Sequence, residues 1–283
     1  MISIQTNVAA LYGLQNLQAN QMKQQNTIEQ MTSGFRINSS ADDPAGLAQA
    51  NQLRNQNAEL TQGVQNGNNA VGQLQIIDGG MNNISQILDR LKTLATEGAS
   101  TTFTGSFSTL ANEFVADVNE ITRQAGNVGM SSGGNFQASL SVYIGGGLGN
   151  SNGNQIGTST ETIDLSASAA DASGLGLSNY TNTAALSNAA NFQTAIAKVA
   201  AAVTSLGTIQ GVVGAGINQL NFSVSLAQSQ ITNYASAQSG LRDANMAQLA
   251  TQASQSQVLM QSSMAALAQA NQSAQGVLKL LQG

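Results

Sequence analysis

Three carboxylates in one predicted helix come closest to the pattern of an active site. Glu113, Asp117 and Glu120 follow one another at steps of four and three residues, which places them on one side of a helix. Such a row could perform acid–base chemistry or bind a cation. The chain has no His and no Cys, however, so it lacks the usual general base, metal ligand and thiol nucleophile. We therefore interpret the row as a solvated helix face, and we expect no enzyme activity, no metal and no cofactor.

Charge is scarce along the whole chain. Charged residues make up 8% of the 283 residues, and the net charge is −5. The basic residues are scattered, so we expect no nucleic-acid partner and no attraction to an anionic membrane. The sequence has no long apolar run that predicts membrane insertion, and its first residues lack the features of a cleavable secretion signal. Long helices with so few charges repel one another little, which favours self-association.

The clearest structural signal is a heptad pattern between Phe192 and Leu241. Apolar residues recur there at alternating steps of four and three, and this spacing predicts a long helix with one apolar stripe that packs on partner helices. One seam is Phe192, Val199, Leu206, Val213, Leu220, Ala227, Tyr234 and Leu241, and the other is Ile196, Val203, Gln210, Ile217, Val224, Ile231 and Gln238.

A second long helix is predicted from Pro44 to about Glu97. Asp43 suits its N-cap, and Pro44 suits the first helical position, where a missing N–H costs nothing. Several glycines weaken this helix by up to about 1 kcal/mol each, so we expect packing to hold it and the small residues to mark close helix approaches. Its predicted buried ladder is Leu53, Leu60, Gly67, Leu74, Met81, Leu88 and Ala95, with Ala70, Ile77, Ile84 and Leu91 beside it.

Shorter elements complete the pattern. Helices are predicted over residues 7–33 and 108–126, with Gly34 as the C-cap of the first. Alternating apolar and polar residues predict a strand over 136–144, and residues 161–165 suit the returning strand of a hairpin. The helical pattern resumes after residue 241. We therefore predict a mainly α fold, in which the N- and C-terminal halves form a long antiparallel coiled-coil rod with a small β-hairpin region in the middle.

Both ends of the chain resemble the bacterial flagellins. Residues 33–46 read Ser-Gly-Phe-Arg-Ile-Asn-Ser-Ser-Ala-Asp-Asp-Pro-Ala-Gly and are similar to the N-terminal signature of that family. Leu241-Arg242-Asp243, residues 268–272 and residues 277–281 resemble its C-terminal motifs. The resemblance covers about residues 1–130 and 190–283, and the short middle implies a form without large outer domains. The chain departs from the family pattern at Gly240, Asn245, Gln248 and Ala274.

The resemblance implies a structural subunit that assembles into the flagellar filament for motility, by helical polymerisation that does not close. Residues 1–42 with 238–283 would form a terminal, inner-tube domain, residues 43–135 with 188–237 a helical rod domain, and residues 136–187 a short variable β-hairpin region. It also implies an extracellular location, export without a cleaved signal peptide, and a cap protein, junction proteins and an export chaperone as partners. The alternatives are a hook–filament junction protein and a recognition ligand or adhesin for a host receptor.

The expected subunit interface combines apolar residues of the terminal helices with charged residues of the connection after the first helix. An apolar stripe beside an uncharged back face is best explained by burial on several sides in an assembly. In such an interface each charge would need a partner; the alternative for the connection is a helix cap with solvated charges. The predicted interface residues are Val8, Leu11, Leu17, Arg36, Asp42, Asp43, Leu267, Val277, Leu278 and Leu281.

Residues 89–95 resemble the flagellin stretch that an animal innate immune receptor recognises. Arg90, Leu94 and Glu113 match the residues of that contact, whereas Asp89 and Thr93 depart from the usual types. The alternative is that Leu94 packs inside the rod and Arg90 is an ordinary surface charge.

Overall fold

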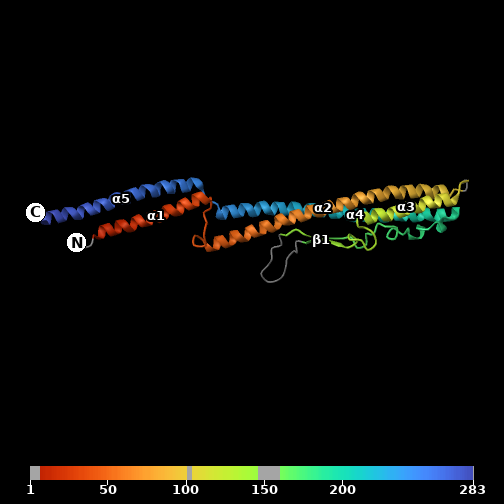
Figure 1. Cartoon of the computed structure of the whole chain (residues 1–283), viewed down its shortest axis with the longest axis horizontal. Coiled ribbons are helices and arrows are strands. Elements are labelled where there is room, and N and C mark those ends of the chain that lie inside the picture. Colours follow the sequence, from red (N-terminus) through yellow and green to blue (C-terminus); the bar gives the residue numbers. More distant parts are fainter. Residues whose placement is uncertain (1–6, 101–103, 146–159, 283) are drawn as a thin grey trace. The chain divides into compact units, whose positions relative to one another are not determined.

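The computed structural model of the chain describes residues 7–100, 104–145 and 160–282, with the backbone alone at residue 274 and residues 277–282. It divides into two compact units. Unit 1 consists of Met1–Asn55 and Asn233–Gly283, and unit 2 consists of Gln56–Thr232. The elements of both units are labelled in Figure 1. The prediction of a mainly α fold with a small antiparallel hairpin is confirmed.

In unit 1 the helices α1 (Val8–Ser33) and α5 (Met246–Gln282) lie side by side and antiparallel (Figure 1). Asn7 Nδ2 donates to the Ala270 carbonyl at 3.0 Å, and Asn20 Nδ2 donates to Ser263 Oγ at 3.1 Å. Between these two hydrogen bonds Leu267 packs over Gly13, where an added Cβ would lie 3.6 Å from Leu267 Cδ1. Amide groups and one small residue therefore set the register of this helix pair.

The ends of α1 follow from single residues. Asn7 Oδ1 accepts the amide N–H of Ala10 at 3.1 Å, which caps the first turn. Gly34 has a φ of 75°, and its amide donates to the Gln30 carbonyl at 3.0 Å, so the predicted glycine C-cap is confirmed. The next helix, α2 (Pro44–Gly98), starts where the sequence predicts it, with the Gly46 amide donating to Asp43 Oδ1 at 2.9 Å.

The core of unit 2 lies between α2, α3 (Phe107–Asn127) and α4 (Ala189–Arg242). The ring of Phe114 meets Tyr180 and Phe192 edge to face, with centroids 5.7 and 6.5 Å apart. Tyr180 comes from the short 3-10 helix η1 (Ser178–Tyr180), which with η2 (Thr183–Leu186) occupies a stretch without sequence periodicity. In α2 the predicted ladder is buried except at Leu53, which is half-buried; its large buried members are Leu60, Leu74, Ile77, Met81, Ile84, Leu88 and Leu91.

The second predicted seam of α4 is only partly buried. The first is buried from Phe192 to Ala227, as predicted, whereas in the second Val224 is buried but Val203 is 39% exposed. A second buried row follows the first seam at a step of three residues, whereas the predicted second seam follows it at a step of four. This row consists of Ala195, Ala202, Ile209 and Gly216. These are mostly small residues, and they fit because neighbours approach closely: a Cβ at Gly216 would lie 2.9 Å from Ile163 Cδ1.

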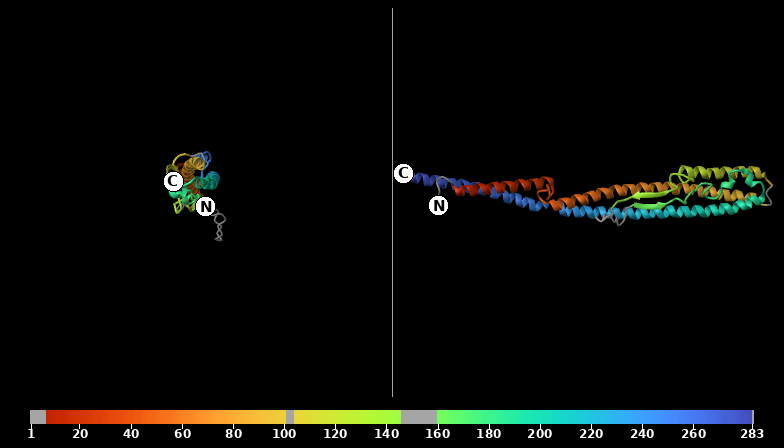
Figure 2. Two further views of the ribbon diagram at one scale, coloured as in Figure 1. Left: turned by 90° about the vertical axis from the view of Figure 1, so that its right-hand side faces the viewer. Right: turned by 90° about the horizontal axis from the view of Figure 1, so that it is seen from below.

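The strands β1 (Ser139–Tyr143) and β2 (Thr160–Asp164) pair antiparallel, with Ser139 opposite Asp164. Figure 2 shows this hairpin lying along α2 and α4. The carbonyl oxygen of Ile144, just after β1, would lie 1.5 Å from a Cβ at Gly63. Gly63 of α2 thus admits the hairpin, while Gly67 marks a close helix approach as expected, since a Cβ there would lie 2.5 Å from Val224 Cγ2 of α4.

Polar side chains fasten the hairpin to both helices. Asn66 Nδ2 of α2 donates to the Tyr143 carbonyl at 3.1 Å, and Ser223 Oγ of α4 donates to Glu161 Oε2 at 3.2 Å. Further along the chain, the buried carboxylate of Asp171 accepts the amides of Ser132 and Gly174 at 2.8 and 2.7 Å, and the Ala172 amide donates to Thr122 Oγ1 of α3 at 3.4 Å. The irregular segments of unit 2 are therefore tied to one another and to its helical core.

Among the described residues one helix, α4, is long and apolar enough to cross a membrane. This is weak evidence for a membrane span, because core helices of soluble proteins pass the same test. A row of its side chains packs into the core of unit 2.

Candidate functional site

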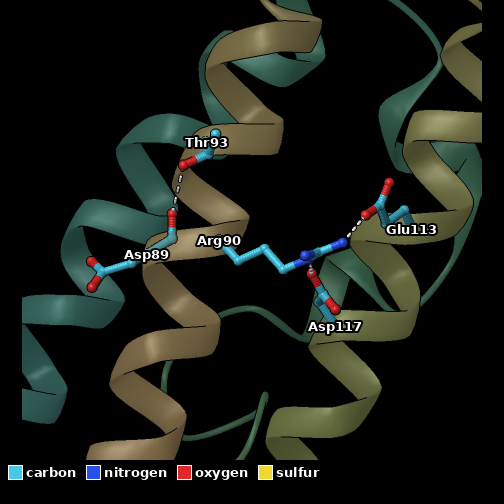
Figure 3. A network of polar contacts seen from close by, with 5 residues as sticks. All are labelled: Asp89, Arg90, Thr93, Glu113 and Asp117. Atoms are coloured by element: carbon cyan, nitrogen blue, oxygen red, sulfur yellow. Dashed lines mark hydrogen bonds and ion pairs between the residues drawn. The ribbon is translucent and has the colours of Figure 1, made fainter.

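The carboxylate row of α3 is engaged by arginines. Arg90 reaches from α2 to α3, where its guanidinium pairs with Glu113 and its Nε donates to Asp117 Oδ2 at 3.1 Å (Figure 3). One turn further, Arg123 Nε donates to Glu120 Oε2 at 2.7 Å. Each of the three carboxylates thus has a cationic partner, as expected of a structural ion-pair network at the surface.

The pKa values of this network follow from its contacts. Hydrogen bonding to Glu113, together with the charge of Asp117, raises the pKa of Arg90. Partial burial raises the pKa of the Asp117 carboxyl, and the neighbouring Arg90 charge opposes that rise. Hydrogen bonds from Arg123 and Gln124 lower the pKa of Glu120. Within the described residues no group of three or more His, Cys, Asp or Glu side chains is placed to hold a metal ion.

The three residues matched to the receptor contact are only partly accessible together. The side chains of Arg90 and Glu113 are adjacent and 60% and 42% exposed. Leu94, one turn along α2, is 7% exposed and belongs to the core. Asp89 points away from the arginine network, and its carbonyl accepts the Thr93 hydroxyl at 3.1 Å (Figure 3).

The connection between α1 and α2 is bound to the C-terminal end of α4. The Arg36 amide donates to the Arg242 carbonyl at 2.6 Å, and a guanidinium nitrogen of Arg36 donates to the Leu241 carbonyl at 2.8 Å. The guanidinium of Arg242 in turn lies over the Phe35 ring, 4.0 Å from its centroid. A cation at these carbonyls is favourable because the last carbonyls of a helix carry partial negative charge. Sequence patterns do not indicate this non-local partner of Arg36.

Asp42 and Asp43 shape the same connection. Asp42 Oδ2 accepts the amides of Ser39 at 2.8 Å and Asn38 at 3.0 Å, and these hydrogen bonds lower the pKa of its carboxyl. Asp43 is the N-cap of α2. Arg36, Asp42 and Asp43 therefore all have partners within the chain, in agreement with the cap alternative for Asp43. Their contact with a second subunit stays a prediction.

Apolar side chains gather on the outside of unit 1. Val8 and Leu11 are 51% and 56% exposed, whereas Leu17 and Leu267 are half-buried. The predicted interface residues Val277, Leu278 and Leu281 lie outside the residues whose side chains are described. Sequence reasoning missed further exposed residues, which helical spacing from Val8 and Leu11 could have found on α1. They are Tyr12, Leu14, Met22 and Ile28 on α1, and Met246, Val258, Leu259 and Met264 on α5.

Unit 2 also exposes a few large apolar side chains that sequence reasoning missed. Phe222 is 77% exposed on α4, and Leu226 follows it by one turn. Both lie outside the heptad seams, so the period that finds the core passes over them.

Two family models match the chain. Residues 4–137 match the bacterial flagellin N-terminal helical region, and residues 193–281 match the bacterial flagellin C-terminal helical region. Together they cover most of the chain and leave out both strands of the hairpin and the irregular segments after it.

Curated relatives match along nearly the whole length. The chain is 28% identical over 292 residues to "Flagellin FlaB2" of Treponema pallidum, which covers 98% of this chain and 99% of that protein. It is 28% identical over 280 residues to "Flagellin" of Halalkalibacterium halodurans, with the same coverage of 98% and 99%. It is 26% identical over 294 residues to the "Flagellar filament 33 kDa core protein" of Treponema phagedenis, again with 98% and 99% covered.

A solved structure is also similar. The crystal structure of Bacillus cereus flagellin matches with a TM-score of 0.43 and 23% identity, covering 62% of this chain and 94% of that one. The family models and the full-length relatives carry the assignment and confirm the predicted resemblance. The chain belongs to the bacterial flagellin family, and it is a structural subunit of the flagellar filament.

Proposed function

We propose that the chain polymerises mainly through the exposed apolar side chains of unit 1, which we call the terminal surface. The terminal surface consists of Val8, Leu11, Tyr12, Leu14, Met22 and Ile28 on α1, and Met246, Val258, Leu259 and Met264 on α5. The observation that carries the proposal is the exposure of these ten residues on a helix pair that has little core of its own. Large apolar side chains left exposed in such number on one helix pair favour an interaction site.

The physical driving force is burial of apolar area. Each square ångström of apolar surface removed from water contributes roughly 25 cal/mol, and obligate interfaces bury upwards of about 2,000 Å². Two antiparallel helices cover only one side of each other, so neighbouring copies must cover the rest. Repeating one such contact from copy to copy gives a helical polymer that does not close.

The same proposal assigns roles along the chain. Residues 1–42 with 238–283 form the inner tube, residues 43–135 with 188–237 form the surrounding rod, and residues 136–187 are the variable part of the rod. The existence of two compact units supports separate roles for the ends and the middle. Leu17, Leu267, Val277, Leu278 and Leu281 would extend the contact along the inner tube.

Arg36, Asp42 and Asp43 enter the proposal through the shape of the connection. Their intrachain hydrogen bonds hold the backbone that links α1 to α2. Arg36 and Asp42 are exposed, so both also remain available to a neighbouring subunit. A fixed connection presents the same surface in every copy, which a helical lattice requires.

Truncation tests the proposal. Chains lacking residues 1–30 or 250–283 should keep the helical signal of unit 2 in circular dichroism but fail to form filaments on short seeds. Sedimentation with electron microscopy at neutral pH reads out assembly, with the full chain as the control. Filaments from either truncated chain at ordinary subunit concentrations would contradict the role of the terminal surface. Full-length monomer that stays soluble and does not elongate the seeds would favour a junction protein.

The filament of this family lies outside the cell. We further propose export without cleavage of a signal peptide, with an export chaperone, a cap protein and junction proteins as partners. Membership of the flagellin family supports this. Peptide mass spectrometry of subunits released from filaments tests the point, since an uncleaved chain retains residues 1–7 in its N-terminal peptide.

A second candidate function is recognition by an animal innate immune receptor. The adjacent, exposed side chains of Arg90 and Glu113 favour it. Because Leu94 is buried, the contact would be made by this ion pair and the exposed side chains around it. Monomer binding at micromolar receptor should weaken in Arg90→Ala and stay unchanged in Arg123→Ala, a control arginine that is equally exposed. Equal binding by both variants would count against this candidate.

A further inference from the structure

The methionines whose side chains are described differ in exposure between the two units. In unit 1, Met22 is 60% exposed, Met264 49% and Met246 48%, while Met31 and Met260 are half-buried. In unit 2, Met81 and Met130 are both fully buried, at 0%. An oxidant in solution therefore reaches thioethers of the terminal helices and not those of the rod core.

The exposed methionines lie in rows on their helices. Met264 follows Met246 by eighteen residues, which is about five full turns, so the two share one face of α5. Met22 follows Leu11 by eleven residues, about three turns, so it shares a face of α1 with a residue of the terminal surface. Each sulfur thus lies on a helix face that the polymer would cover.

We propose that Met22, Met246 and Met264 form a peroxide-sensitive modification site that controls polymerisation of the free subunit. This inference rests on the proposed function, because it takes the terminal surface as the subunit contact. The site is present in the monomer and is covered when the filament forms.

The chemistry is a two-electron oxygen transfer. A sulfur lone pair attacks one oxygen of hydrogen peroxide, an S–O bond forms as the O–O bond breaks, and the other oxygen leaves as water after proton transfer. The thioether is oxidised to a sulfoxide and the peroxide is reduced. The product is polar and chiral, so a side chain that suited an apolar contact no longer does.

Two consequences distinguish this site from general oxidative damage. Unit 2 keeps its fold, because its own methionines are buried, so an oxidised subunit remains folded there but is assembly-incompetent. Subunits already in a filament are protected, because neighbouring copies cover the three sulfurs.

The experiment treats full-length monomer with hydrogen peroxide, removes the oxidant, and maps the oxidised residues by peptide mass spectrometry. Met22, Met246 and Met264 should gain oxygen before Met81 and Met130. Burying the new polar groups should raise the subunit concentration needed for seeded assembly about tenfold or more. A combined Met22→Leu, Met246→Leu and Met264→Leu variant, which roughly conserves side-chain volume, should assemble equally well before and after peroxide.

Each other outcome has a definite meaning. Oxidised monomer that assembles like untreated monomer would overturn the inference while leaving the proposed function intact. Equal inhibition of the leucine variant would overturn the assignment to these three residues. Filaments whose methionines oxidise as fast as those of monomer would show that the contact does not cover them. Failure of untreated monomer to assemble would contradict the proposed function itself.

Discussion

Units 1 and 2 are built from helices of similar composition but bury them to different extents. In unit 2 each long helix has several neighbours, and Phe114 and Phe192 are fully buried between them. In unit 1 the paired helices have mainly each other. The buried apolar residues among its described side chains are Ile37, Ala50 and Leu249, while Val8, Leu11 and Val258 remain exposed.

This difference shows how one kind of low-charge helix can serve as core or as interface. What decides is the number of neighbours that the chain itself supplies. In unit 2 the hairpin and the irregular segments pack on the unit's own long helices. In unit 1 large apolar side chains of the paired helices stay exposed. Unit 2 should therefore be stable in the monomer, and unit 1 should gain its full stability on assembly.

The largest expected effect is in the core of unit 2. Phe192→Ala should lower its free energy of unfolding by about 3–5 kcal/mol, because the lost ring leaves a cavity beside Phe114. Phe222→Ala is a matched control on the same helix, and since Phe222 is 77% exposed its effect should stay within about 0.5 kcal/mol. Chemical denaturation followed by circular dichroism compares the two. Similar losses in both variants would break the contrast between core and surface.

A smaller effect is expected where the hairpin meets α2. Gly63→Ala places a Cβ 1.5 Å from the Ile144 carbonyl oxygen, so the hairpin must shift, at a cost of about 1–3 kcal/mol. Gly72→Ala meets nothing within 4 Å and should instead stabilise α2 by about 0.5–1 kcal/mol. A lower melting temperature for Gly63→Ala and a higher one for Gly72→Ala would support the hairpin as part of the core. A higher melting temperature for both variants would contradict it.

In unit 1 the cap of α2 should be worth less than either core contact. Asp43→Ala removes the acceptor for the Gly46 amide and should cost about 1 kcal/mol, whereas Asp43→Asn retains an acceptor and should cost a fraction of that. Amide hydrogen exchange in the first turn of α2 measures both. Unchanged exchange in the Ala variant would mean that the cap is not formed in solution.

The smallest effect is a pH dependence in the connection. The folded pKa of Asp42 lies below its ordinary value of 3.8, because the carboxylate accepts the Ser39 and Asn38 amides. Its stabilisation is therefore present above that ordinary value and is lost as the pH falls through the folded pKa. The protection factor of the Ser39 amide, which is its intrinsic exchange rate divided by its observed rate, should therefore fall at acid pH, and Asp42→Asn should remove this pH dependence. A fall that persists in the Asn variant would point to another carboxylate.

Local signals in the sequence predict much of the fold. Gly34, Asp43 and Pro44 mark helix ends through backbone preferences that hold in almost any context, and these boundaries are confirmed. The large members of the α2 ladder are equally legible, because Leu, Ile and Met carry the periodic signal. Family membership is also legible, since both matching regions lie at the ends of the chain.

The features that the sequence does not predict depend on contacts between residues far apart in the chain. The buried row through Ala195, Ala202 and Gly216 carries little hydrophobic signal, and its member Gly216 is covered by Ile163, which is distant in sequence. Arg36 finds its partners more than two hundred positions away, at Leu241 and Arg242. Phe222 lies outside the heptad series, and a heptad pattern identifies buried side chains but not exposed ones.

The placement of the ion pairs has a consequence for the waters in which such a filament works. Among the described residues, the ion pairs join Arg90 to Glu113 and Asp117 and Arg123 to Glu120, all in unit 2. The paired helices of unit 1 are held by amide hydrogen bonds and apolar contact, which dissolved salt screens little. A polymer joined through such helices should hold together at both low and high salt. A swimming cell that carries it could then use the same filament when salinity changes.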